Sequence, residues 1–115
     1  STDGGRTCAG QELVEAFAIA AAVESVVAVG VNCCPPGDVL AAIEIAAATG
    51  KEAVAYPNAG EIWDAENDQW LGAASYDPAV VPGWIGAGAQ WIGGCCRVGP
   101  EAITQIAERA GACNA

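Results

Sequence analysis

The residues of this sequence most able to do chemistry are its cysteines. There are six of them among 115 residues, and histidine is absent. Without histidine the chain lacks the usual acid/base group at neutral pH and the commonest metal ligand, so metal or nucleophile chemistry has to use cysteine, tyrosine or carboxylates. Four cysteines form two adjacent pairs, Cys33-Cys34 and Cys95-Cys96. These two pairs are the first candidates for a functional site.

Three cysteines from the two pairs suit a catalytic zinc site. Zinc takes three protein ligands in such sites and keeps a fourth position for water or substrate, whereas structural sites are closed by four protein ligands. Cys33 or Cys34, together with Cys95 and Cys96, supplies three thiolates. The two glycines before Cys95 leave the backbone room to turn both of the following cysteines toward one ion. No Cys-x-x-Cys spacing occurs, so a four-cysteine knuckle is not indicated.

Two other interpretations of the cysteines stay open. An even number of cysteines in a short chain suits a disulfide framework. Buried parallel strands, the lack of a signal-peptide pattern after Ser1 and the difficulty of bridging adjacent cysteines argue against that framework. Cysteine also serves as a small buried hydrophobe. We expect this role for Cys8 and Cys113, which lie near the termini and outside any strand end.

The pattern of apolar residues predicts the helices that would position these cysteines. Helices are expected over residues 11–23, 38–49 and 78–87, and over a last stretch that begins at Pro100 and ends before Gly111. The expected buried faces are Leu13, Phe17 and Ala20; Leu40, Ile43 and Ala47; and Ile103, Ile106 and Ala110.

Short apolar runs between these helices predict three strands, over residues 26–31, 52–56 and 91–94. The first run is continuous and rich in β-branched residues, which is typical of a parallel strand buried on both faces. Residues 61–76 are acidic and aromatic without a period, so we expect a long ordered loop there. Strands that alternate with helices indicate an α/β fold with a parallel sheet, in which ligands bind at the carboxyl ends of the strands.

Polar side chains accompany the cysteines at those strand ends. Asn32 follows the first predicted strand, and Tyr56, Asn58 and Glu61 follow the second. We expect these four residues to contact a substrate, although a surface role for Glu61 is equally open. Arg97 could pair a substrate carboxylate or balance local acidic groups.

Charge and length limit the partners. A formal net charge of -10 with only four basic residues disfavours nucleic acid and anionic membranes as partners. The 53% hydrophobic content excludes disorder, and the apolar stretch 16–23 is too short to span a bilayer. We expect one domain over residues 1–115, soluble and cytoplasmic. Because the chain starts at Ser1 and has no methionine, we expect it to be processed or a fragment.

Three motifs resemble those of one known family. They are Gly30-Val31-Asn32-Cys33-Cys34, Tyr56-Pro57-Asn58-Ala59-Gly60-Glu61-Ile62-Trp63-Asp64 and Ile92-Gly93-Gly94-Cys95-Cys96-Arg97. In this order they resemble the homocysteine S-methyltransferases over almost the whole chain. The resemblance implies a zinc ion held by Cys33, Cys95 and Cys96, with no assigned role for Cys34. The second motif looks more like the branch that uses S-methylmethionine or S-adenosylmethionine than the betaine branch.

The same resemblance implies a (β/α)₈ barrel, which needs about 250 residues. The three predicted strands look like the last three of eight, with residues 1–10 as the loop after the fifth strand. We therefore expect this chain alone to be inactive, and its full-length parent to transfer a methyl group from a sulfonium to homocysteine, giving methionine. Tyr56, Trp63 or Glu61 could stabilise the sulfonium cation.

Two rival functions remain at this point. The chain could be a zinc-binding module without turnover, or part of the homocysteine domain of a cobalamin-dependent methionine synthase.

Overall fold

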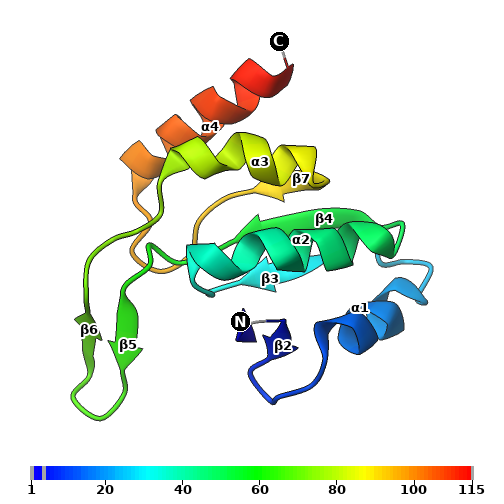
Figure 1. Cartoon of the computed structure of the whole chain (residues 1–115), viewed down its shortest axis with the longest axis horizontal. Coiled ribbons are helices and arrows are strands. Elements are labelled where there is room, and N and C mark those ends of the chain that lie inside the picture. Colours follow the sequence, from blue (N-terminus) through cyan, green and yellow to red (C-terminus); the bar gives the residue numbers. More distant parts are fainter. Residues whose placement is uncertain (1, 4, 115) are drawn as a thin grey trace.

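Three parallel strands form the central sheet of the molecule. The computed structural model describes residues 2–3 and 5–114. Strands β3 (Ala28–Asn32), β4 (Glu52–Tyr56) and β7 (Ala89–Ile92) lie side by side in the order β3-β4-β7, all parallel (Figure 1). The expected α/β fold with parallel strands is confirmed. The second strand has the predicted bounds, and the other two differ from prediction by one or two residues.

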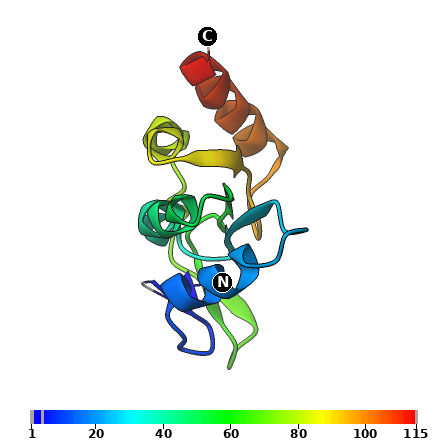
Figure 2. The same cartoon turned by 90° about the vertical axis from the view of Figure 1, so that its right-hand side faces the viewer.

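Four α-helices accompany the sheet in the described part of the chain. They are α1 (Leu13–Ala21), α2 (Val39–Ala48), α3 (Val81–Gly86) and α4 (Pro100–Asn114). Short 3₁₀ turns, η1 (Pro36–Asp38) and η2 (Pro78–Val80), lead into α2 and α3, and the Asp77 carboxylate caps η2 by accepting from the Ala79 N–H. Helices α2 and α3 lie on the same side of the sheet, and α4 packs on α3 (Figure 2).

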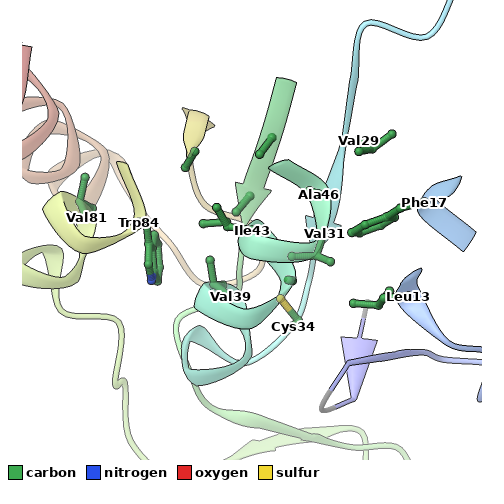
Figure 3. Packing of buried hydrophobic residues seen from close by; sticks show 14 of the residues in the cluster. Leu13, Phe17, Val29, Val31, Cys34, Val39, Ile43, Ala46, Val81 and Trp84 are labelled. Atoms are coloured by element: carbon green, nitrogen blue, oxygen red, sulfur yellow. The ribbon is translucent and has the colours of Figure 1, made fainter. Parts of the chain in front are cut away.

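The core lies between the sheet and these helices. Val29 and Val31 of β3 face Phe17 of α1 and Ile43 and Ala46 of α2 (Figure 3). Buried and more exposed positions alternate along β3 and β4, so the expectation of strands buried on both faces is wrong for the described chain. The reason is that the described helices cover only one face, which leaves alternate side chains more exposed.

Helices α2 and α4 differ from the prediction in the residues that they bury, and α4 also differs in where it ends. The buried face of α2 is Val39, Ala42, Ile43 and Ala46, whereas Leu40 is 45% exposed. In α4, Ile106 is buried but Ile103 is 42% exposed. That helix continues through Gly111 to Asn114, so Gly111 is not the residue that ends it. Glycine favours the end of a helix but does not require it, and in α4 the helical backbone continues past Gly111.

The segment expected as a loop contains a β-hairpin instead. Strands β5 (Ile62–Asp64) and β6 (Gln69–Leu71) pair antiparallel and project from the body (Figure 1). Trp63 lies opposite Trp70, and the two rings meet edge to face with centroids 5.3 Å apart. The Asp64 carboxylate accepts hydrogen bonds from Asn67 Nδ2 and from the Glu66 and Asn67 N–H groups, which closes the turn.

The N-terminal residues form a second small hairpin. Strand β1 (Thr2–Asp3) pairs antiparallel with β2 (Arg6–Thr7), where the sequence predicted a loop. Among the described residues, no helix combines the length and hydropathy required to cross a membrane.

Candidate metal centre

Three loops meet at the carboxyl edge of the sheet. We call residues 33–34, 57–60 and 93–96 the strand-end cluster. Since parallel strands end at the same edge, the register that places Asn32 beside Tyr56 also brings the loops after β3 and β4 together. Backbone hydrogen bonds then connect all three loops. They run from Cys33 N to Tyr56 O (3.2 Å), Asn58 N to Cys34 O (3.1 Å), Gly93 N to Ala55 O (2.9 Å), Cys95 N to Pro57 O (2.7 Å) and Ala59 N to Cys96 O (3.0 Å).

The cluster brings together the sulfur atoms of Cys33, Cys95 and Cys96. All three lie within 4.8 Å of one another, and Cys95 Sγ is 3.9 Å from Cys96 Sγ. Sulfur is a soft donor that selects zinc and related ions, with Zn–S distances of about 2.3 Å. Three sulfurs this close therefore fit one thiophilic ion. The sequence predicted this convergence.

Cys33 and Cys95 are joined by a disulfide bond, with their Cα atoms 5.5 Å apart. The sequence disfavours a disulfide framework, because parallel strands are buried, no signal-peptide pattern is present and adjacent cysteines cannot easily bridge each other, so this bond corrects that expectation. The structure differs because the loops after β3 and β7, the strands on either side of β4, both bond to the end of β4 and place these two Cα atoms within the normal disulfide range. A sulfur in a disulfide is not a thiolate, so only the reduced protein presents all three sulfur ligands.

The remaining cysteines have other environments. Cys34 is fully buried and belongs to the core cluster, which fits its lack of an assigned role. Cys8 is exposed, so the expectation that it is a buried hydrophobe is wrong. The short β1–β2 hairpin and its neighbouring turn do not provide a core for it. The side chain of Cys113 lies outside the described residues.

Unusual backbone conformations flank the sulfur atoms. Cys33 has φ 50° and Arg97 has φ 64°, which is uncommon for residues other than glycine and often marks functional sites. Gly94 has to be glycine for a different reason. A Cβ atom there would lie 2.5 Å from Cβ of Val98, so a larger residue would displace the loop that carries Cys95 and Cys96.

Tyr76, which is not among the predicted site residues, bonds to the loop that carries Cys95 and Cys96. Its hydroxyl donates a hydrogen bond to Gly93 O (3.1 Å), and its ring lies against Trp84 with centroids 5.4 Å apart. Its N–H also donates to Ala59 O (3.1 Å). Burial raises the pKa of Tyr76 to about 12. The only signal in the sequence is a tyrosine just before the Asp77 turn.

A hollow of about 800 Å³ adjoins the sulfur atoms. Cys33 and Cys96 line it, as do Trp63 and Trp70 of the hairpin. Glu61, also in its wall, forms an ion pair with Arg97. Trp70 is not among the predicted site residues, although a tryptophan on each side of the Asn67-Asp68 turn is a signal for a cross-strand aromatic pair.

The four residues predicted to contact a substrate do not all line the same hollow. Asn58 and Glu61 line the hollow, and Asn58 Oδ1 accepts a hydrogen bond from Gly60 N (2.9 Å). Tyr56 instead lines a separate hollow of about 360 Å³ with Trp91. Asn32 ends β3 beside Tyr56 and is half-buried. Arg97 is occupied by Glu61, so one of its two expected roles, balancing a local acidic group, is observed.

Comparison with known proteins decides the family. The model of the family described as homocysteine S-methyltransferase matches residues 1–110. The chain belongs to this family. This chain is 41% identical over 114 residues to a selenocysteine Se-methyltransferase of Brassica oleracea var. italica, covering 95% of this chain and 33% of that protein. It is 40% identical to homocysteine S-methyltransferase 1 of Zea mays, covering 94% of this chain and 35% of that protein.

Solved structures agree with this assignment. The homocysteine methyltransferase MmuM from Escherichia coli, in its apo form, matches with a TM-score of 0.71 and 30% identity, over 93% of this chain and 36% of that chain. MmuM has also been solved in forms described as metallated and oxidized, which match equally well. This chain thus spans about a third of the length of the relatives it matches.

Proposed function

We propose that this chain supplies the sulfur-ligand part of an active site that transfers a methyl group from a sulfonium donor to homocysteine, giving methionine. The observation that carries the proposal is the convergence of three cysteine sulfurs within 4.8 Å at the edge of a parallel sheet. Family membership supplies the reaction class. S-methylmethionine or S-adenosylmethionine is the proposed donor.

Cys33, Cys95 and Cys96, in reduced form, would hold a zinc ion. Bound there, zinc would lower the pKa of the homocysteine thiol and leave its sulfur nucleophilic, whereas a free thiol, with a pKa near 8.5, is mostly protonated at neutral pH. The fit rests on the donor set, because three sulfurs from two loops meet without any histidine in the chain.

The methyl transfer itself needs no acid or base from this chain. The homocysteine thiolate attacks the methyl carbon in line, and a new S–C bond forms. The S–C bond to the donor sulfur breaks, and its electron pair stays on that sulfur as a neutral thioether. Since no proton moves in this step, a chain without histidine is adequate for it.

Other residues of the chain would position the substrates. We propose that Asn58 and Glu61, in the wall of the hollow beside Cys33 and Cys96, contact an amino-acid substrate. Asn32 and Tyr56 end adjacent strands on the face that no described helix covers, and would contact substrate from there.

We further propose that residues 1–115 form the C-terminal part of a (β/α)₈ barrel, with β3, β4 and β7 as its last three strands. The likeness to MmuM over 36% of that chain supports this arrangement. Catalysis requires the thiolate and the methyl carbon to be held about 3–3.5 Å apart and in line. Loops of other strands would complete that pocket, so this chain alone should be a poor catalyst.

Metal analysis of the reduced protein tests the ligand set. We expect about one zinc per chain, and loss of that zinc in the Cys33→Ser, Cys95→Ser and Cys96→Ser variants. Cys8→Ser is the matched control, because Cys8 is exposed and is not part of the sulfur cluster. Full zinc content in all three variants would exclude the proposed ligands.

A turnover assay tests the reaction. Methionine formation from homocysteine and S-methylmethionine or S-adenosylmethionine is measured for this chain and for a reconstructed barrel of about 250 residues. We expect turnover by the barrel and little by this chain. Zinc binding without turnover by the barrel would favour a metal-binding module instead, and equal turnover by both would show that the other strands are dispensable.

A further inference from the structure

We propose that the β5–β6 hairpin is the wall that recognises the positive charge of the methyl donor, mainly through the ring of Trp63. This inference rests on the proposed function and specifies where its sulfonium substrate binds. The hairpin is separate from the three-stranded sheet, yet Trp63 and Trp70 line the same hollow as Cys33 and Cys96.

The hairpin presents an aromatic surface to the hollow. A sulfonium carries a positive charge but has no N–H or O–H to donate, so hydrogen-bond acceptors cannot identify it. Aromatic faces can, because the ring quadrupole attracts cations that are poorly hydrated. Trp63 is 48% exposed and lies in the wall of the hollow. The edge of one tryptophan against the other fixes the orientation of both rings.

The two tryptophan rings differ in whether a cation of the chain already contacts them. The guanidinium carbon of Arg97 lies 5.8 Å from the centroid of the Trp70 ring, so this ring already interacts with a cation of the chain itself. Arg97 is also paired with Glu61, which reduces its repulsion of a second cation. Trp63 therefore remains as the ring for a ligand, and Trp70 supports it.

The hairpin and the residues beside it carry negative charge. Residues 61–72 contain four acidic residues and no lysine or arginine: Glu61, Asp64, Glu66 and Asp68. The hydrogen bond from the Asn67 side chain leads the interactions that hold the pKa of Asp64 below its usual value, so this carboxylate is ionised at neutral pH. An aromatic surface with nearby negative charge favours a cationic ligand over a neutral one.

The hairpin should act on binding rather than on the chemical step. The donor sulfur loses its positive charge as the methyl group leaves, so its attraction to the Trp63 ring weakens toward the transition state. Loss of the ring should therefore raise KM for the donor more than it lowers kcat. This feature distinguishes Trp63 from the sulfur ligands, whose loss should abolish turnover.

An NMR titration of the reduced 115-residue chain tests the inference without any turnover. The chain has four tryptophans, at positions 63, 70, 84 and 91, so each indole N–H can be assigned. S-methylmethionine is compared with methionine, and S-adenosylmethionine with S-adenosylhomocysteine. We expect the sulfonium of each pair to shift the Trp63 and Trp70 signals at lower concentration than its neutral counterpart.

Variants sharpen this result. Trp63→Leu should weaken binding of the sulfonium about 3- to 30-fold, the range expected for a cation–π contact, while Trp63→Phe should retain most of it. Trp91→Leu is the control, because Trp91 is 58% exposed but lines other hollows. The dispersed signal of Trp84, which is buried, reports whether each variant is folded.

The inference is overturned if the sulfonium and the neutral compound bind equally, if neither binds, or if only the Trp91 signal moves. The comparison of compounds on the unaltered chain stands even if Trp63→Leu fails to fold. Failure here would leave the zinc and turnover results intact. Conversely, selective sulfonium binding without zinc binding or turnover would contradict only the proposed function.

Discussion

The strand-end cluster and the β5–β6 hairpin face the same hollow but are held in place by different means. Main-chain hydrogen bonds connect the three loops of the cluster, from Cys33 through Pro57 to Cys95. The hairpin is joined to them chiefly by side chains, through the Glu61–Arg97 ion pair and the contact of Arg97 with Trp70. Side-chain substitutions should therefore alter the hairpin readily and the cluster only where they displace its backbone.

The first and largest predicted effect comes from displacing that backbone. Gly94→Val would force a Cβ atom to 2.5 Å from Cβ of Val98. We expect the free energy of unfolding to fall by about 1–3 kcal/mol, as for overpacked sites, with loss of zinc binding. Denaturant unfolding and metal analysis measure both.

Gly99→Val is the matched control for this variant. No atom lies within 4 Å of the Cβ position there, so stability and zinc content should stay near those of the unaltered chain. Equal behaviour of the two variants would contradict the view that the backbone of the cluster determines the sulfur positions.

A smaller effect is predicted for Arg97→Ala, which removes the connection between the hairpin and the cluster. We expect a loss of about 1 kcal/mol, since the Glu61 side chain is only 10% exposed and would lose its ion-pair partner. Amide hydrogen exchange should become faster in residues 62–71, while zinc content is unchanged. Arg109→Ala, an exposed arginine of α4, is the control. Zinc loss in Arg97→Ala would show that the two regions are not separable.

The smallest effect is predicted for Tyr76→Phe, which removes one hydrogen bond to Gly93 and should cost about 0.5–1 kcal/mol. The pH dependence is more diagnostic. The pKa of Tyr76 is raised from 10.0 to about 12 in the folded protein. Its stabilising contribution is therefore complete below pH 10 and is lost as the pH rises toward 12, because the unfolded chain releases this proton first.

Alkaline unfolding combined with ultraviolet absorbance tests this dependence. The unaltered chain should lose stability in that interval, and Tyr76→Phe should lose less. Identical slopes in the two proteins would show that Tyr76 is not the group responsible.

The contrast between the two regions also explains what could be predicted from the sequence. Residues 52–56 were predicted with the observed bounds, because a short apolar run between turn residues has few other ways to pack. Parallel strands end at one edge, so the sequence predicted that Cys33 and Cys95 lie at the same edge of the sheet. Their disulfide did not follow, because a covalent bond depends on a few ångströms that strand patterns do not specify.

The hairpin and the exposed residues could not be predicted in this way. Strands of three residues are too short to show an alternation of apolar and polar residues. Trp63 and Trp70 come into contact only once the turn closed by Asp64 has formed. Leu40 is exposed because the buried face of α2 is centred on Val39, Ala42, Ile43 and Ala46, and the apolar pattern fits this face as well as the predicted one. The place of Tyr76 depends on its hydrogen bond to Gly93, 17 residues away, which a local pattern does not reveal.

The order of strands in the central sheet has a consequence for inheritance. Strands β3, β4 and β7 are neighbours in the same order as they occur along the chain. All three sulfur donors, the hairpin and Arg97, together with the three strands that position them, therefore belong to one continuous stretch, residues 28–97. A single recombination event could move this stretch to another parallel-sheet protein with every one of these groups included.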